Sequence, residues 1–399
     1  MSNTPADGVR ETVLRTIDAA AGELVALSTR IHKTPEVAFH EVQASQWLTD
    51  ALERRGFQVR RGVADLPTAF RAEALGREPG PAVAILAEYD ALPEIGHACG
   101  HNLICTAAVG AAFGLAAAKD RLPGKTVVLG TPAEEGGGGK VLMLQRGEFV
   151  GLDVALMVHP ASYTLTMRPS LASYRLRVKY LGKAAHAASA PFEGINALDA
   201  LIQLFVAIGL LRQQLREDAR VHGIITYGGA AANIIPDRAE ATFSVRATDS
   251  AYAKEALDKV LSCARASAEA TGATLEFETK KGYDAMKANR PLADAFGRHL
   301  RELNWSVDAL PARPRMGSTD LGDVSQVLPS IHPYMTIGRD LTGHTTEFRE
   351  AACSPQAFQT MLVASKAIAL TALDVLTDAA FLAQVRADFT GAEARPRVG

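Results

Sequence analysis

Residues 82–102 read AVAILAEYDALPEIGHACGHN, and this stretch predicts the fold class and the position of a functional site. Its first half is a run of small apolar residues with the length of a buried strand. Polar side chains follow at once, with Asp90 at the end of the run and Cys99 and His101 a few positions later. The Ala-rich segment 103–118 then has the composition of a buried helix. A buried strand followed by polar residues and a buried helix is typical of a βαβ unit.

The same order recurs along the chain. TVVLGTPAEE (126–135) predicts a second strand, residues 140–147 predict a short helix, and DVALMVHP (153–160) predicts a third strand. Before them, apolar residues spaced three and four apart over 13–31 predict one amphipathic helix. Alternating strands and helices of this kind favour an α/β domain with a mostly parallel sheet.

Residues 171–283 follow a different pattern. The segment SLASYRLRVKYL (170–181) alternates apolar and polar residues, as a half-exposed strand does. A helix, two strands, a helix and a strand are predicted after it, which is the β-α-β-β-α-β order of a ferredoxin-like unit. We therefore expect two domains: a main α/β domain formed by 1–170 plus 284–399, and an inserted α+β domain at 171–283.

The composition excludes several classes of function. The 399 residues are 48% hydrophobic and 22% charged, with a net charge of −2, which gives no electrostatic case for nucleic acid or an anionic membrane. No apolar stretch reaches the roughly 18 residues of a membrane span. No signal peptide is evident, and four irregularly spaced cysteines do not suggest a disulfide framework. We expect a cytoplasmic protein.

Several potential metal ligands lie at the predicted strand ends. The three strands end at Asp90, at Glu134–Glu135 and at His159, and ligand sites of open α/β sheets lie at the carboxyl ends of the strands. A further histidine lies in TGHTTEF near the end of the main domain. The candidate ligands are Cys99, His101, Glu135, His159 and His344.

Thiolate, imidazole and carboxylate together suit a divalent transition metal such as Zn²⁺, Mn²⁺, Co²⁺ or Ni²⁺. Five protein ligands exceed what one catalytic zinc ion takes, because a position must stay open for water, so two metal ions are expected. Of the adjacent carboxylates, one can bind metal while the other accepts a proton. Position alone does not say whether Glu134 or Glu135 is the base.

Three alternatives stay open at this level. Cys99 and His101 also fit a cysteine nucleophile beside its base, in a hydrolase that needs no metal. A non-catalytic binding protein on the same fold is a second alternative. The third is a phosphate loop in EEGGGGK, which we disfavour because Val141, not Ser or Thr, follows Lys140.

Several stretches together make the chain resemble the M20 family of metallopeptidases and amidohydrolases. In the family's order these are AEYDALPEIGHACGHN, TPAEEGGGGK, VHP, GKAAHAASAPFEGINALDA, ANIIPDRAEATFSVRA, GSTDLGDVS and GHTTEF. The resemblance covers nearly the whole chain and lies within the branch of indole-acetyl-amino-acid and aminobenzoyl-glutamate hydrolases and β-alanyl-lysine dipeptidase-like proteins. Asn102 stands where many auxin-conjugate relatives carry Asp, which disfavours auxin conjugates as substrates.

The resemblance implies a role for each candidate residue. Cys99, His101, Glu135, His159 and His344 would hold two metal ions, zinc or manganese first, with Cys99 bridging them. Glu134 would be the general acid and base, and Asp90 would orient a ligand. His186 of the partner subunit in a homodimer would stabilise the oxyanion, and Asn233 and Arg246, expected on adjacent strands, would bind the substrate's free carboxylate. The inserted domain would be a lid and dimerisation domain.

By the same resemblance the protein is a hydrolase of the amide bond in an N-acyl or aminoacyl amino acid. The expected substrates are small molecules with a free carboxylate: aminobenzoyl-glutamate-like compounds, N-acyl amino acids or dipeptides.

Overall fold

The computed structural model describes residues 5–311 and 314–391, and the chain divides into two compact units. Unit 1 comprises Met1–Arg168, Lys287–Pro314 and Asp323–Gly399, and unit 2 comprises Pro169–Met286 and Arg315–Gly322. The sequence places 315–322 in the main domain, whereas the structure joins it to unit 2. The reason is local: the Leu171 N–H donates to the Gly317 carbonyl at 2.8 Å, and the Ser318 hydroxyl donates to the Leu171 carbonyl at 2.7 Å.

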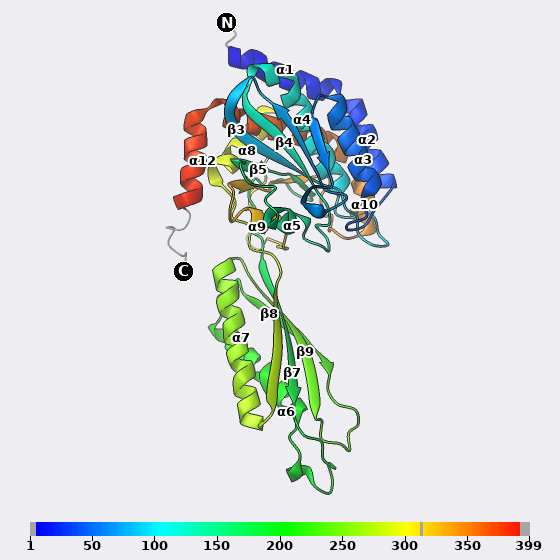
Figure 1. The fold of residues 1–399 in the computed structure, drawn as a ribbon, viewed down its shortest axis with the longest axis vertical. Helices are drawn as coiled ribbons and strands as arrows, with labels where there is room; N and C mark the ends of the chain where they lie inside the picture. The colour runs from blue at the N-terminus through cyan, green and yellow to red at the C-terminus, as the bar shows by residue number, and fades with distance from the viewer. Residues whose placement is uncertain (1–4, 312–313, 392–399) are drawn as a thin grey trace. The chain divides into compact units, whose positions relative to one another are not determined.

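Unit 1 contains a six-stranded sheet in the order β1-β2-β4-β3-β5-β11. Figure 1 labels its strands β3, β4 and β5. Its strands are β1 (Gln58–Arg61), β2 (Phe70–Leu75), β3 (Glu78–Glu88), β4 (Pro123–Thr131), β5 (Val154–Leu156) and β11 (Ser330–Ile331). Strands β4, β3, β5 and β11 run parallel, and β1 and β2 form the antiparallel edge. This confirms the predicted α/β class with a mostly parallel sheet.

The helices of unit 1 bury one continuous apolar core with this sheet. They are α1 (Pro5–Ala19), α2 (Ala21–Lys33), α3 (Val42–Arg54), α4 (His101–Ala117), α5 (Gly139–Gln145), α8 (Arg290–Glu302), α10 (Thr346–Ala351), α11 (Pro355–Thr377) and α12 (Ala379–Gly391), with α9 (Leu321–Val324) at the boundary between the units. Helix α4 is buried from His101 to Ala116 and packs against β3 and α11. A Cβ at Gly110 would lie 2.5 Å from the Ser365 hydroxyl, so glycine allows this close helix pair.

Two predicted elements of unit 1 are each divided in the structure. The helix expected over 13–31 is interrupted at Ala20, whose φ of −88° and ψ of 0° separate α1 from α2, although both halves keep the apolar stripe in the core. The strand expected over 153–160 becomes β5 and β6 (His159–Ala161). Strand β6 pairs with β12 (Tyr334–Thr336) in a separate two-stranded sheet.

Helix α11 contradicts the expectation that no apolar stretch is long enough to span a membrane. Within the described residues it is long and apolar enough to cross a membrane, because an 18-residue window of it has a mean hydropathy of 1.5. However, 72% of its apolar window is buried inside the protein. A buried core helix passes the same test, so this helix is weak evidence for a membrane span.

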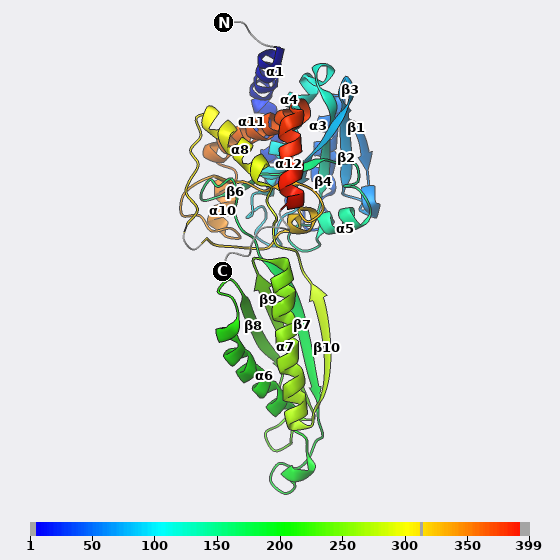
Figure 2. The ribbon, with the colours of Figure 1, turned by 90° about the vertical axis from the view of Figure 1, so that its left-hand side faces the viewer.

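Unit 2 is an antiparallel sheet in the order β10-β7-β9-β8 with helices α6 and α7 on one face (Figure 2). Its elements are β7 (Ala172–Leu181), α6 (Ala197–Leu211), β8 (Arg220–Tyr227), β9 (Arg238–Ala247), α7 (Ser250–Thr271) and β10 (Thr274–Lys281). The order of elements along the chain and across the sheet is that of a ferredoxin-like unit. Alternate residues of β7 and β9 point into a separate apolar core beneath the two helices.

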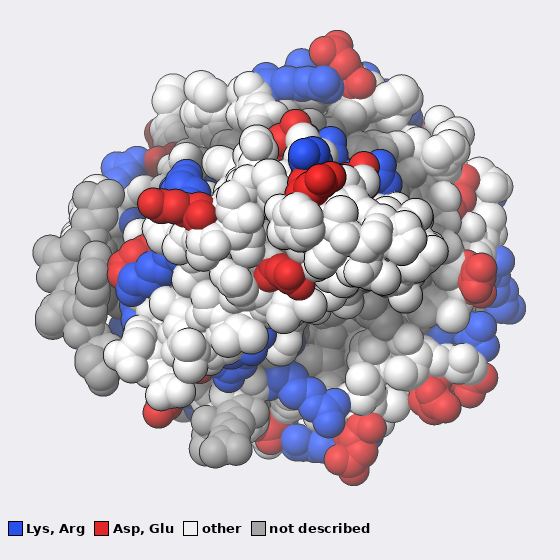
Figure 3. All heavy atoms as spheres, turned by 90° about the horizontal axis from the view of Figure 1, so that it is seen from below, with Lys and Arg blue, Asp and Glu red and all other residues white. Residues whose placement is uncertain are grey.

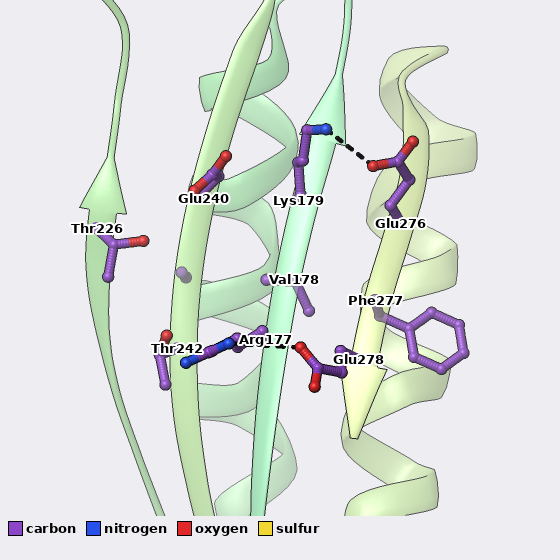
Figure 4. A pocket seen from close by; sticks show the side chains of 10 residues that line it. Arg177, Val178, Lys179, Thr226, Glu240, Thr242, Glu276, Phe277 and Glu278 are labelled. Carbon is purple, nitrogen blue, oxygen red and sulfur yellow. Dashed lines mark hydrogen bonds and ion pairs between the residues drawn. The ribbon is translucent and has the colours of Figure 1, made fainter. Parts of the chain in front are cut away.

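The other face of this sheet has a shallow hollow of about 560 Å³ with charged walls (Figure 4). Lys179 pairs with Glu276 at 2.9 Å, and Arg177 pairs with Glu278 at 3.5 Å. Charges of both signs also stand beside one another on the face of the molecule seen in Figure 3. This mixture agrees with the small net charge of the sequence.

Candidate metal centre

The carboxyl ends of β3, β4 and β5 bring the candidate ligands together in unit 1. The parallel register pairs Glu88 with Thr131 and Ile85 with Leu156, so the segments after these strands leave the sheet at the same edge. Gly100, with a φ of 77°, ends the loop before α4. A Cβ there would lie 2.5 Å from the Pro160 ring, so glycine lets the loop that carries Cys99 pass directly beside His159.

The five candidate ligands form two groups that share one sulfur atom. Cys99, His101 and His159 have ligand atoms within 4.8 Å of one another, and so do Cys99, Glu135 and His344. The Cys99 Sγ lies 3.4 Å from the His159 Nε2, and the His344 Nε2 lies 3.3 Å from the Glu135 Oε1. Two triads with a common thiol are the arrangement expected of two metal ions with one bridging ligand.

His101 and His159 both present Nε2 to this centre, because the Nδ1 atom of each forms a hydrogen bond with another group. The His101 Nδ1 lies 3.0 Å from the Asp90 Oδ1, and the His159 Nδ1 lies 2.6 Å from the Pro160 carbonyl, so each Nδ1 donates its proton. The second Asp90 oxygen accepts the Glu135 N–H at 2.9 Å. Among the described residues, the buried His101 Nε2 has no hydrogen-bond partner, which fits a lone pair meant for a metal ion.

The electrostatics of the site also fit cations. Burial lowers the pKa of His159 to about 4, so its imidazole is neutral and free to act as a ligand. Burial opposes the charge on His101, yet the Asp90 carboxylate raises the pKa of His101 well above its usual value, so a metal ion that binds at Nε2 must displace the proton from this nitrogen. Burial raises the pKa of the Cys99 thiol. A nucleophilic cysteine needs a lowered pKa, so this environment disfavours the cysteine hydrolase and favours a thiol that a bound cation deprotonates.

The loop after β4 carries the two adjacent carboxylates. Glu135 belongs to the triad with Cys99 and His344, whereas Glu134 is grouped with His101 and Glu135 and, in a second group, with Glu88 and Asp320. This supports Glu135 as the ligand and Glu134 as the base, which stay predictions.

Glu41 holds the start of this loop, and no pattern in the sequence pointed to it. Ala133 has a φ of 60°, and its N–H donates to the Glu41 carboxylate at 2.9 Å. The same buried carboxylate accepts the Phe39 N–H at 3.0 Å and the Thr68 hydroxyl at 2.8 Å. Glu41 therefore supports the backbone that positions Glu134.

His332 is buried beside His159. The two rings have centroids 5.5 Å apart, and the Tyr334 hydroxyl lies 3.4 Å from the His332 Nδ1. The His332 Nε2 has no hydrogen-bond partner in the described part of the chain. His332 is thus a polar group at the edge of the metal centre.

The predicted residues of unit 2 fall in two places rather than one. His186 and Asn233 lie on loops that pair with each other, since the Ala187 N–H donates to the Asn233 carbonyl at 3.1 Å. Both side chains are exposed. Arg246 lies near the far end of β9, exposed, and donates to the Ser244 hydroxyl. Eight residues of strand, about 26 Å, separate it from the start of β9, which follows the Asn233 loop. The prediction that Asn233 and Arg246 lie on adjacent strands is wrong.

Comparisons with known proteins agree with this geometry. Residues 166–272 match the model of a peptidase dimerisation domain of the M20 type. The chain is 44% identical over 389 residues to a mouse (Mus musculus) Xaa-Arg dipeptidase, covering 94% of this chain and 90% of that protein. It is 30% identical over 444 residues to a subunit of the p-aminobenzoyl-glutamate hydrolase of Escherichia coli, covering 92% of each.

Solved structures share the fold. A putative aminohydrolase from methicillin-resistant Staphylococcus aureus superposes with a TM-score of 0.80 at 22% identity, over 92% of this chain and all of that one. The Bacillus subtilis YXEP protein, described as a dinuclear metal-binding peptidase from the M20 family, superposes with a TM-score of 0.73 at 23% identity. That match covers 90% of this chain and 99% of the other.

Proposed function

Because the chain belongs to the M20 peptidase family, we propose that it is a two-metal dipeptidase that releases a basic amino acid from the C-terminus of a dipeptide. It is a metal-dependent hydrolase of amide bonds, as its membership of the M20 family and the names of its relatives indicate. The observation that carries the proposal is the pair of ligand triads that share Cys99. No comparable argument supports a binding protein without activity, because the ligands and the base are all present.

The substrate class rests on the relatives. The chain is 44% and 42% identical to the mouse and human Xaa-Arg dipeptidases, against 30% for the aminobenzoyl-glutamate hydrolase. Of the three substrate classes expected from the sequence, dipeptides are therefore favoured. Asn102, whose side chain bonds to Ser28 and to the Ala352 carbonyl, is buried in the protein and does not bear on the substrate.

The proposed reaction divides its tasks among the residues of this centre. Bound metal ions would lower the pKa of a water molecule and polarise the scissile carbonyl. Glu134 would accept the proton of the attacking water and pass it to the leaving amine. Asp90 would keep the His101 proton on Nδ1 and fix the backbone of Glu135, so that both ligands face the centre.

The positions of His186 and Arg246 support a site completed by a second copy of the chain. Because His186 and Asn233 lie together and Arg246 lies at the other end of β9, the three cannot meet one substrate within a single unit 2. We infer that the substrate's carboxylate contacts Arg246 of one protomer and Asn233 of the partner subunit. The partner subunit's His186 would stabilise the negative charge on the carbonyl oxygen.

The surface of unit 2 supports a homodimer. Ile202, Val206 and Leu210 form a stripe along α6 and are 48%, 58% and 64% exposed. The neighbouring edge strand β8 exposes Ile224 and Ile225. An apolar helix face beside an open strand edge is a surface that a second copy covers. Val206→Asp should convert the dimer to monomer in sedimentation velocity, whereas Ser262→Asp on the exposed face of α7 should not. A monomeric wild type would contradict this proposal.

The metal, the compartment and the remaining partners are proposed on chemical grounds. Sulfur, nitrogen and carboxylate donors suit Zn²⁺ or Mn²⁺, with Co²⁺ or Ni²⁺ as substitutes. All four cysteines are free thiols, which supports a cytoplasmic location. We propose no nucleic-acid or membrane partner. Elemental analysis of protein purified without added metal would identify the native ions.

The activity is tested with Glu134→Gln and a panel of substrates. The wild type should hydrolyse Xaa-Arg and Xaa-Lys dipeptides faster than aminobenzoyl-glutamate, N-acetyl amino acids or indole-acetyl amino acids. Glu134→Gln should lose turnover and still bind two metal ions, while Glu94→Gln, in the loop before the ligands, should keep both. Full turnover in Glu134→Gln would refute the mechanism, and a preference for aminobenzoyl-glutamate would refute the substrate class.

A further inference from the structure

A buried ion pair borders the metal centre. Lys140, in the first turn of α5, is fully buried, and its ammonium contacts the Oε1 atom of Glu88. Glu88 is the last residue of β3 and is 1% exposed. Removing two charges from water is costly, and such a pair adds little to stability compared with apolar side chains of the same size. The pair therefore calls for a functional reason.

The glycines of EEGGGGK bring the lysine to this place. Gly138 has a φ of 68°, and a Cβ on Gly139 would lie 1.8 Å from the Pro132 carbonyl. Helix α5 can therefore begin directly against the end of β4, and Lys140 enters the interior. A cation in the first turn of a helix is also disfavoured by the helix dipole. Neither burial nor helix formation explains a lysine here, whereas the Glu88 carboxylate does.

The second oxygen of Glu88 faces the candidate ligands. Glu88 Oε2 lies 3.7 Å from His101 Nε2, close to the 3.9 Å that separates Glu135 Oε1 from the same nitrogen. Two ligand atoms on one tetrahedral zinc ion lie about 3.4 Å apart. Glu88 is thus near enough to become a ligand of the ion that His101 binds. A fourth protein ligand there would take the position that water needs.

We propose that Lys140 is a positioning residue that holds the Glu88 carboxylate out of the coordination sphere of the His101 metal ion and so keeps a position open for water. The inference rests on the two-metal site proposed above. The ammonium competes with the metal ion for the carboxylate, and the lysine is fully buried in the first turn of α5. The lysine of the glycine-rich segment therefore acts on a carboxylate of the protein rather than on a phosphate.

The experiment compares the wild type, Lys140→Met and the double variant Glu88→Gln/Lys140→Met, each loaded with Co²⁺. Metal stoichiometry, dissociation constants from chelator competition, and visible absorption report on the ligands without any turnover. In Lys140→Met the freed Glu88 should bind the ion, tightening one site by about 10- to 100-fold, the scale on which neighbouring groups tune metal affinity. Its visible absorption should weaken as the coordination number rises, and turnover should fall. The double variant should return to the affinity and spectrum of the wild type.

Lys366→Met is the matched control. It removes a lysine whose ammonium pairs with the Asp18 carboxylate at 2.5 Å, and neither residue belongs to the metal centre. It should leave both metal sites unchanged. Unchanged affinity and spectrum in Lys140→Met would overturn the proposal. If that variant does not fold, the double variant decides: loss of metal there would show that the pair supports binding, which also overturns it. A wild type that binds no metal would instead refute the proposed function.

Discussion

Replacing Asp90 with asparagine tests how one buried carboxylate organises the metal centre. Its two oxygens have different partners: the His101 Nδ1 at 3.0 Å and the Glu135 N–H at 2.9 Å. Burial alone would raise the pKa of Asp90, but the charge and hydrogen bond of His101 hold that pKa below its usual value. The carboxylate is therefore ionised in the folded protein and accepts from both groups.

Asparagine has nearly the same shape but one acceptor oxygen, so one of the two contacts is lost in either orientation. If its NH₂ group faces Glu135, two donors meet in a buried site, which costs about 1–3 kcal/mol. If the NH₂ group faces His101, the imidazole must move its proton to Nε2 and lose the lone pair for the metal. Loss of such a supporting carboxylate costs about 10- to 100-fold in metal affinity, or about 1.4–2.7 kcal/mol.

The assay is competition for Zn²⁺ against a chelating dye, with elemental analysis of the dialysed protein. Asp90→Asn should bind the ion that contacts His101 more weakly by that factor and retain less metal after dialysis. Asp153→Asn is the control, because Asp153 also accepts a backbone N–H, that of Ala82 at 2.8 Å, at the other end of β3. Equal affinity in Asp90→Asn and wild type would show that Asp90 does not orient the ligands, and the argument from the His101 tautomer would fail.

Three further changes give distinct outcomes. The Asn102 amide donates to the Ala352 carbonyl at 3.0 Å, and Asn102→Asp would place a carboxylate against that carbonyl. The free energy of unfolding in urea should therefore fall by at least about 3 kcal/mol, and an unchanged unfolding midpoint would contradict this. Burial raises the pKa of Glu41, so the folded protein holds this proton more tightly than the unfolded chain and loses stability as the pH rises through that pKa. Glu41→Gln should therefore show a smaller loss of stability than wild type as the pH rises above the usual pKa of a glutamate, and a steeper loss would reverse the sign of the argument. Gly100→Ala should weaken metal binding and destabilise the protein. Gly151 has a similar φ of 75° but no atom within 4 Å of an added Cβ, so Gly151→Ala should lower the free energy of unfolding by only about 1 kcal/mol. Equal effects in the two variants would show that the close contact at Gly100 has no role.

Local sequence predicts those residues of the site that lie at the ends of strands. Asp90, Glu135 and His159 follow buried strands, and parallel strands bring their carboxyl ends to one edge, so periodicity alone brings these residues together. His344 is different, because it lies on a loop with a φ of 65° and no local pattern connects it to Cys99. Only the resemblance of GHTTEF to a family motif pointed to it.

What local sequence missed depends on contacts between distant segments. The strand expected over 153–160 divides because its second half pairs with β12, about 175 residues later, rather than with β3. Lys140 lies in the segment where a phosphate loop is disfavoured, and no local pattern connects it with Glu88, its partner at the end of β3. Asn233 is expected on a strand, whereas it lies in the loop between β8 and β9.

The thiol common to both triads has a consequence for how the centre fills. Burial keeps Cys99 protonated, so the first ion to bind must displace that proton, and a second ion then meets a thiolate already formed. The two ions therefore differ in the proton that each releases on binding, and the coupling between the two positions is reciprocal.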